Sequence, residues 1–554
     1  MNLFHYYVVF SKAILFISGL IFSYKLVDLT LFSILITHLT QWKQYTLPKA
    51  VLIVNLQEGA YAILQLLFVF LADTYTGHFM IVMCSTPSYT IGLLLCCVAA
   101  RYDLISIFYA GLVIITFSKA ALQVTLGAFL DDQLLRAEEN AGVTTTTEEN
   151  AERAYARSNF WQVLVTILAV VVAIAVSSKI RSFVTLTIIL TTLMGVAFCW
   201  FLLGIKLYSR NGPTGSDLLL DIVHVIFTAA VIPKNVGSYP HENMQMIPPY
   251  VPWLRWLDKA AMVVTQDQAE SKRSDNNTTC TVEQVKRVKS LLMMLPMWTT
   301  FLTYSLVSAL GSTFFLEQVI YINASASTPI LFNILRIFTK SVVAVTSNYI
   351  LEKLQVVRHQ KSSMLVRIGI GMLFCVFCCL TACINARHYT TIFRLIPQFI
   401  LLGVMEGLST NGLENLFNSQ VSQSTTRYGP PFEECVQGTG KLLNIVCVLI
   451  LTKWHIWIKD DISTSQLDRY YAMLAISSSL NMLIYCFVAY WYCDAEFLPD
   501  GCEVDIEMEI ETSQETTSSS SENQDNPLMS SGAQSFLSRS SSGIQRRVNS
   551  LQRQ

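Results

Sequence analysis

The sequence predicts an all-α membrane protein with twelve transmembrane helices arranged in two six-helix halves. Of the 554 residues, 52% are hydrophobic and only 14% are charged, whereas about 25% charged residues is usual in a soluble globular protein. Twelve apolar runs are long enough for a helix to cross the roughly 30 Å hydrocarbon core of a bilayer. They form two groups of six, separated by a polar stretch at residues 208–288.

The predicted N-terminal half, residues 1–207, precedes this stretch, and the C-terminal half, residues 289–495, follows it. In the first half we place spans near residues 13–37, 50–72, 79–100, 103–127, 159–178 and 183–207. In the second half we place them near residues 289–318, 328–351, 364–385, 392–412, 436–456 and 470–493. Two six-span halves joined by a long loop are the plan of the major facilitator superfamily, whose substrates bind between the halves near the bilayer midplane.

Basic residues predict which side of the membrane each loop faces. Ten Lys and Arg residues fall from Lys206 to Lys289, whereas residues 319–327 contain none. Because cytosolic loops are enriched in Lys and Arg, the central loop and both termini are expected in the cytosol. Lys179 and Arg181 run against this trend, because they fall in a predicted outer loop.

Composition and motifs also argue against several classes of protein. The formal net charge of −1 gives no reason to expect a nucleic-acid partner. The fourteen cysteines lie mostly in apolar runs, and no spacing resembles a metal site. Nothing resembles a Gly-rich phosphate-binding loop, so ATP-driven pumping is not expected. No enzymatic activity and no cofactor are expected either. Ser, Thr and acidic residues dominate from about Thr512, so residues 496–554 are predicted to be a disordered cytosolic tail.

Four sequence blocks, in order along the chain, carry a family resemblance. Residues 201–218 read FLLGIKLYSRNGPTGSDL, and residues 254–261 read LRWLDKAA. Residues 280–298 read CTVEQVKRVKSLLMMLPMW, and residues 397–420 read PQFILLGVMEGLSTNGLENLFNSQ. These blocks resemble the plant nitrate/peptide transporter family, which belongs to the proton-dependent oligopeptide transporters of the major facilitator superfamily.

The resemblance implies a secondary-active transporter that moves a small solute by alternating access. Members of that family move nitrate, peptides, hormones or specialised metabolites, and the sequence does not choose among these substrates. The implied partners are a small-molecule substrate, the lipid bilayer and, where coupling is retained, protons. The implied location is the plasma membrane or the vacuolar membrane. The alternative is a transport-deficient relative that acts as a sensor or regulatory membrane protein.

The first span departs from the family at its proton-coupling motif. The family pattern E-x-x-E-R (or K) aligns here with Ile21, Tyr24 and Lys25, so both acids are missing. Asp28 lies one turn beyond Lys25 on the same helical face, where it is expected to neutralise the lysine. Glu58, in the second span, is another acid that the family does not usually have. Two hypotheses stay open: Asp28 or Glu58 replaces the lost proton carriers, or coupling is altered or lost.

The fourth span lacks the lysine that lines the substrate pathway in the family. Gln123 stands at that position, and Lys119 lies one turn earlier on the same face, where it is expected to reach the same volume. After the second span, Asp73 of a family motif that ties helix ends together is kept, but His78 replaces the usual Arg. Because a histidine is charged only part of the time near neutral pH, this contact is expected to be weaker.

The second half keeps more of the family's polar positions. Glu406 matches an acid that contacts substrate in peptide-transporting relatives, and Arg336 and Lys340 are bases one turn apart at membrane depth. An acid such as Glu406 facing them would lower the cost of burying them. Ser308 stands where some nitrate-transporting relatives carry a histidine, so nitrate selectivity by that means is not expected. Further candidates to line the cavity are Trp298, Tyr304 and Gln318.

Overall fold

A computed structural model describes most of the membrane-spanning part of the chain. The described residues are 12–42, 45–140, 147–180, 182–210, 212, 218–231, 252–261, 280–322, 327–354, 360–387, 391–419, 427–454 and 457–494. The chain divides into two compact units, Met1–Phe497 and Leu498–Gln554. The second unit, and with it the predicted disordered tail at residues 496–554, lies outside the described residues.

Helices account for nearly all of the described chain, and twelve of the segments are long and apolar enough to span a membrane. The first half comprises α2 (Lys12–Thr37), η1 (His38–Trp42), α3 (Leu47–Leu71), η2 (Ala72–Thr76), α4 (His78–Tyr102), α5 (Ile105–Asn140), α6 (Thr147–Lys179) and α7 (Phe183–Leu203). The second half comprises α10 (Leu295–Ser312), α11 (Phe314–Ile322), α12 (Ser327–Leu354), α13 (Gln360–Ala386), η5 (Ile392–Leu395), α14 (Ile396–Asn418), α15 (Gly429–Lys453) and α16 (Leu467–Asp494). The predicted all-α fold with twelve spans is therefore confirmed.

Three shorter elements lie between the two halves in the sequence: α8 (Leu218–Val231), η3 (Pro252–Ala261) and α9 (Val282–Leu292). A capping box starts α9, because Thr281 and Gln284 each bond the other's backbone N–H. Gln284 Nε2 also donates to Asp221 Oδ1 at 2.7 Å, and Lys289 forms an ion pair with Asp258. These contacts tie α8, η3 and α9 together, so the described parts of the central stretch are folded against one another.

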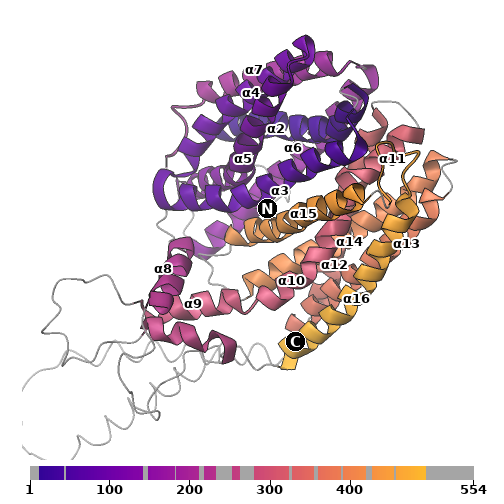
Figure 1. The fold of residues 1–554 in the computed structure, drawn as a ribbon. Coiled ribbons are helices and arrows are strands. Elements are labelled where there is room, and N and C mark those ends of the chain that lie inside the picture. The colour runs from indigo at the N-terminus through magenta and orange to yellow at the C-terminus, as the bar shows by residue number, and fades with distance from the viewer. Residues whose placement is uncertain are drawn as a thin grey trace, which may run out of the picture. The chain divides into compact units, whose positions relative to one another are not determined.

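Successive spans run in opposite directions, so the connections between them alternate between the two ends of the bundle. We call the end beside α8, η3 and α9 the linker end, and the end with η1 and α11 the far end (Figure 1). At the linker end the chain reverses between η2 and α4 through Gly77, whose φ of 74° is rarely adopted by other residues.

The two halves meet along several helix pairs. Helices α3 and α15 lie side by side (Figure 1), and a Cβ atom on Gly438 would come within 2.5 Å of the Ala62 Cβ. Only glycine permits this approach. Helix α12 packs against α2 and α6, and α11 packs against α2. These contacts bring together polar residues from the first and second halves in the middle of the bundle.

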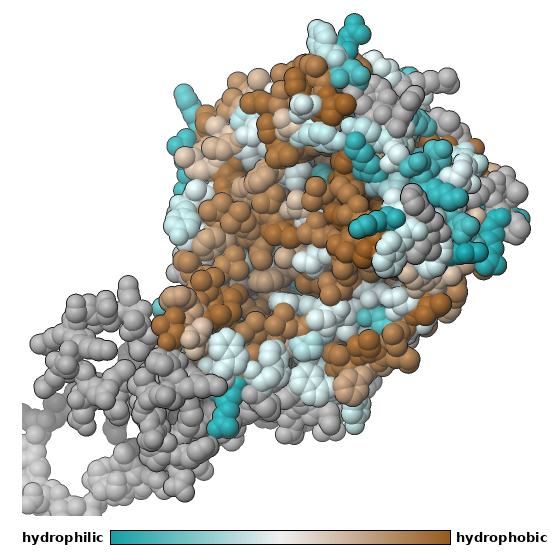
Figure 2. Space-filling view, viewed as in Figure 1, coloured by the Kyte–Doolittle hydropathy of each residue, from teal (hydrophilic) through white to brown (hydrophobic). Residues whose placement is uncertain are grey.

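The outer face of the bundle is apolar. Large hydrophobic side chains stay exposed along α6 and α16, for example Leu164, Leu168, Leu480 and Phe487. Hydrophobic residues cover most of the face shown in Figure 2 between the two ends of the bundle. A surface of this kind is costly in water but suited to lipid chains, in agreement with the predicted transmembrane arrangement.

Candidate functional site

Ionisable side chains from both halves gather in the middle of the bundle. In the first half, Lys119 Nζ lies 2.6 Å from Asp28 Oδ1. Lys119 also lies over the rings of Phe32 at 3.7 Å and Tyr61 at 4.5 Å, and these contacts add cation–π attraction. The expected ion pair between Asp28 and Lys25 is therefore corrected: the ion pair of Asp28 is with Lys119 on the neighbouring helix α5, while Asp28 still interacts electrostatically with Lys25.

Lys25 instead meets a neutral partner. Its ammonium group donates to Gln123 Oε1 at 3.3 Å, and the Tyr24 hydroxyl donates to the same oxygen at 3.1 Å. Among the described residues, no carboxylate lies within ion-pair distance of Lys25. Since an ammonium group has three donors, Lys25 can bind a further acceptor. Gln123, which stands where the family has a lysine, thus accepts a hydrogen bond from Lys25.

Glu58 links the two halves. Its Oε2 atom lies 3.1 Å from Lys441 Nζ on α15 and accepts a hydrogen bond from Ser312 Oγ on α10 at 2.9 Å. Both partners belong to the second half, whereas Glu58 belongs to α3 of the first half. In this conformation Glu58 is therefore the acid of an ion pair between the halves, and its removal would strand a buried cation.

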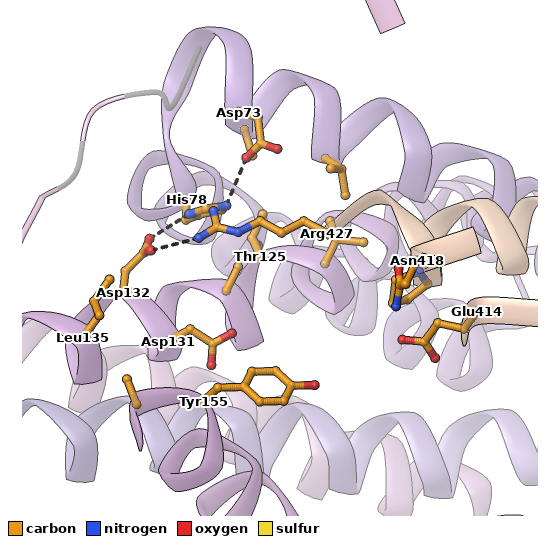
Figure 3. Close-up of a pocket in the computed structure, with 16 residues that line it drawn as sticks. Asp73, His78, Thr125, Asp131, Asp132, Leu135, Tyr155, Glu414, Asn418 and Arg427 are labelled. Atoms are coloured by element: carbon orange, nitrogen blue, oxygen red, sulfur yellow. Dashed lines mark hydrogen bonds and ion pairs between the residues drawn. The ribbon is translucent and has the colours of Figure 1, made fainter. Parts of the chain in front are cut away.

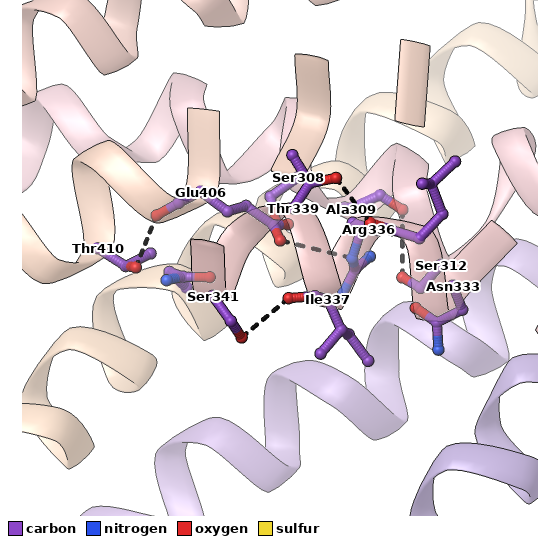
Figure 4. Close-up of polar contacts among 12 residues, drawn as sticks. Ser308, Ala309, Ser312, Asn333, Arg336, Ile337, Thr339, Ser341, Glu406 and Thr410 are labelled. Atoms are coloured by element: carbon purple, nitrogen blue, oxygen red, sulfur yellow. Dashed lines mark hydrogen bonds and ion pairs between the residues drawn. The ribbon is translucent and has the colours of Figure 1, made fainter. Parts of the chain in front are cut away.

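Glu406 and Arg336 form the ion pair of the second half. Arg336 Nε lies 3.4 Å from Glu406 Oε2, and the Ser308 hydroxyl donates to Glu406 Oε1 at 2.8 Å (Figure 4). Glu406 is buried, with 4% of its surface exposed. The expected approach of an acid to the bases of α12 is confirmed for Arg336. Ser308 holds the same carboxylate from the seventh span.

The aromatic and amide candidates of the seventh span lie in packing contacts of the second half. Tyr304 and Gln318 have no exposed surface, so the expectation that they line a cavity is corrected. Gln318 accepts a hydrogen bond from Gln398 at 3.2 Å. Trp298 stacks on Phe432 with ring centroids 5.7 Å apart, because α10 packs directly against α15.

The eleventh span supplies site residues that sequence reasoning missed. Lys441 pairs with Glu58, and Glu433 bonds Gln437 within α15. Glu434 is close enough to Lys25 and to Tyr61 to interact electrostatically with both. The available signal was the pair of adjacent acids, with a lysine two turns later, inside an otherwise apolar run.

A cavity of about 520 Å³ lies at the linker end, between the halves. Asp73, His78 and Asp132 line it from the first half, and Arg427 reaches Asp132 from the second half (Figure 3). His78 Nδ1 lies 2.8 Å from Asp132 Oδ2, and His78 Nε2 lies 3.5 Å from Asp73 Oδ1. Arg427 Nη2 lies 3.9 Å from Asp132 Oδ1. Only the doubly protonated imidazole can donate to both carboxylates.

The far end is closed by hydrogen bonds between the halves. Leu47 N donates to Asp460 O at 2.7 Å, and Asn333 Nδ2 donates to Ser33 Oγ at 2.7 Å. Thr40 Oγ1 lies 3.3 Å from Glu317 Oε2. The described halves therefore touch through polar groups at the far end and enclose a cavity at the linker end.

Two six-helix halves around a charged centre, closed at one end and hollow at the other, are the arrangement of a secondary membrane transporter. The POT family model, PTR2, matches residues 79–456. The chain therefore belongs to the POT family, whose members are membrane transporters and not enzymes. The predicted family membership is thereby confirmed.

Relatives and solved structures agree with this assignment. The chain is 26% identical over 498 residues to Protein NRT1/PTR FAMILY 5.5 of Arabidopsis thaliana, covering 83% of this chain and 93% of that protein. It is 26% identical over 547 residues to Protein NRT1/PTR FAMILY 5.7 of the same plant, covering 87% and 88%. The crystal structure of the POT family transporter PepTSo matches with a TM-score of 0.64 at 15% identity, covering 88% of this chain and 100% of that one. An auto inhibited POT family peptide transporter matches with a TM-score of 0.60 at 15% identity, covering 87% and 97%.

Proposed function

We propose that this transporter carries a small amphoteric solute, with one anionic and one cationic group, through the central site. The observation that supports this choice is the balance of charge between α2, α3, α5, α12, α14 and α15. With Arg367 of α13, six cations and six acids on these helices interact electrostatically with one another: Lys25, Lys119, Arg336, Lys340, Arg367 and Lys441, and Asp28, Glu58, Glu406, Glu414, Glu433 and Glu434. A balanced cavity favours a solute that is itself balanced, because a bare anion would leave a net charge away from water.

Two groups are suited to hold the charged ends of such a solute. Among the described residues, the side-chain hydrogen bond of Lys25 goes to the neutral Gln123, so its remaining donors fit a carboxylate or another anionic group. Glu434 is partly exposed and interacts electrostatically with Lys25, across the boundary between the halves. An amphoteric solute placed between Lys25 and Glu434 would contact both halves at once, so its binding can favour the conformation in which the two halves approach each other around it.

Alternating access follows from the different closure of the two ends. We infer that the linker end, and both termini, lie on the cytosolic side, because the central stretch is rich in basic residues. On that assignment the structure corresponds to a state open toward the cytosol, in the plasma or vacuolar membrane. Transport then requires the far-end contacts to break while the Asp73, His78, Asp132 and Arg427 cluster tightens.

Proton coupling is inferred to differ from that of the family. The first-span acids are replaced by Ile21 and Tyr24, and Asp28 and Glu58 each hold a cation in this conformation. A paired carboxylate takes up a proton less readily than an unpaired one. These losses also favour the alternative role, a transport-deficient sensor that binds a solute without moving it.

Uptake in expressing cells separates these possibilities. We expect accumulation of an amino-carboxylate or a short peptide, little accumulation of nitrate, and a loss of uptake in Lys25→Gln at normal surface expression. Lys459→Gln, which alters an exposed cation at the far end, is the matched control. Saturable nitrate uptake that does not depend on Lys25 would contradict the proposed substrate class. Solute binding to the purified protein without uptake would instead support the sensor.

A further inference from the structure

Glu317 lies at the far end, where the two halves are closed against each other. Its carboxyl oxygen Oε2 is 3.3 Å from the hydroxyl oxygen of Thr40, which belongs to η1 of the first half. Glu317 is the one acidic residue in the segment STFFLEQ, residues 312–318 of the seventh span. No contact of the central site involves Glu317.

Among the described residues, no basic side chain forms an ion pair with Glu317, and its only side-chain hydrogen bond is with Thr40. Helix α11 and the elements packed against it carry titratable or charged side chains that include Tyr321, His38, Asp28, Tyr304, Arg336, Lys340, Arg394, Asp468, Arg469, Tyr470 and Tyr471. Arg336 forms an ion pair with Glu406, and Asp468 forms one with Arg387. Neither Arg394 nor Arg469 lies within ion-pair distance of Glu317. A carboxylate here would therefore depend on one hydroxyl group.

That hydroxyl has other acceptors within reach. Thr40 Oγ1 lies 3.2 Å from Ile36 O and 3.2 Å from Thr37 O, besides 3.3 Å from Glu317 Oε2. A threonine has one hydroxyl proton, and in a helix it usually goes to a carbonyl three or four residues earlier. If Glu317 is ionised, three acceptors compete for one proton. If Glu317 is protonated, its O–H donates to Thr40 while Thr40 donates to its own helix, and every group is satisfied.

We propose that Glu317 is the proton-binding site of the far-end gate: it holds one proton while the halves are closed there and releases it when they part. The proposal rests on alternating access as proposed above. When α11 and η1 separate, Glu317 meets water, and a water-exposed glutamic acid is ionised near neutral pH. Closing the far end then takes up one proton. By linkage, acid on that side favours closure by up to tenfold per pH unit.

This assignment gives the chain a proton site after the loss of the first-span acids. A proton taken up from the far side favours the conformation that exposes the central site to the linker side, and it returns to the far side when that end opens. Neither Asp28 nor Glu58 needs to leave its ion pair for this step. The far-end gate and the central solute site would thus be coupled through the conformation that they share.

The test is a distance measured across the far end as a function of pH. Two fluorophores are introduced as unnatural amino acids at positions 179 and 463, at exposed far-end sites of the first and second halves, in purified protein in lipid nanodiscs. We expect the closed fraction to rise as pH falls from 8 to 5. Glu317→Gln keeps a donor toward Thr40 without a titratable group, so it should stay closed and lose the pH response.

Two further variants keep the outcome interpretable. Glu283→Gln removes an exposed acid at the start of α9 and should keep the full pH response. Thr40→Val removes the hydroxyl on which an ionised Glu317 depends and should move the midpoint of the response to higher pH, so it replaces Glu317→Gln if that variant does not fold. The proposal would be overturned if the far-end distance of the wild-type protein did not change with pH. It would also be overturned if Glu317→Gln kept the full pH response of that distance. If Glu317→Gln loses the pH response while the wild-type protein takes up no solute, the far-end gate is upheld and the proposed transport function is refuted.

Discussion

Replacing Asp28 by Asn tests which lysine the first-span acid serves. The Lys119 Nζ to Asp28 Oδ1 distance is 2.6 Å, and the exposed fractions of the two side chains are 9% and 31%. Removing one partner of a buried ion pair costs about 3–5 kcal/mol, because the other charge stays buried. Since Asp28 is partly exposed, we expect a loss near the lower limit, about 3 kcal/mol. The rings of Phe32 and Tyr61 stay beside Lys119 and keep the loss from being larger.

A pair of double variants identifies the partner. Asp28→Asn with Lys119→Gln removes both charges and leaves two amides able to bond each other, so it should recover more than half of the lost stability. Asp28→Asn with Lys25→Gln leaves Lys119 stranded, so it should recover none. The measurement is the apparent melting temperature of the purified protein, followed by the exposure of buried cysteines to a thiol-reactive dye. Equal recovery in both double variants would refute the assignment of Asp28 to Lys119.

Three further predictions concern the rest of the site. Glu406→Gln should lower uptake about tenfold, equivalent to about 1.4 kcal/mol, at normal surface expression, whereas Glu283→Gln should not; wild-type uptake would remove Glu406 from the site. His78→Gln should speed maleimide labelling of a cysteine at position 418 in a cysteine-free background. The ratio of the variant's labelling rate to the parent's should fall toward one as the pH rises, because the parent's ring then also loses a donor, and equal rates at neutral pH would refute the bridging role. Tags at residues 232–251 and at the C-terminus should be reached by antibody only after permeabilisation, and labelling of intact cells would reverse the orientation.

Local patterns in the sequence predicted the fold because membrane spans depend on local composition. Each span needs about twenty apolar residues in a row, and the bilayer sets that length. The polar stretch between the halves was equally visible. Even so, α9 begins at Val282, inside the stretch expected to be a loop, because its first turns carry charged residues and continue the seventh span toward the linker end.

The partners in the site were harder to predict because they lie on different helices. Asp28 was matched with Lys25 through the spacing within one helix, but the nearer cation is Lys119, 91 positions away. Glu58 and Lys441 meet across the halves, and no periodicity connects α3 to α15. The contact between Arg336 and Glu406 was predicted correctly, because both residues lie at a similar depth within their spans.

The three central ion pairs differ in what transport demands of them. Asp28 and Lys119 both belong to the first half, and Arg336 and Glu406 both belong to the second, so each of these pairs can move with its half. Glu58 and Lys441 lie on opposite halves, and rocking that separates α3 from α15 strands two charges at membrane depth. Stranding charges there costs several kcal/mol unless a solute offers each of them a replacement partner. An amphoteric solute meets both demands at once, so the empty transporter should exchange between its two states more slowly than the loaded one.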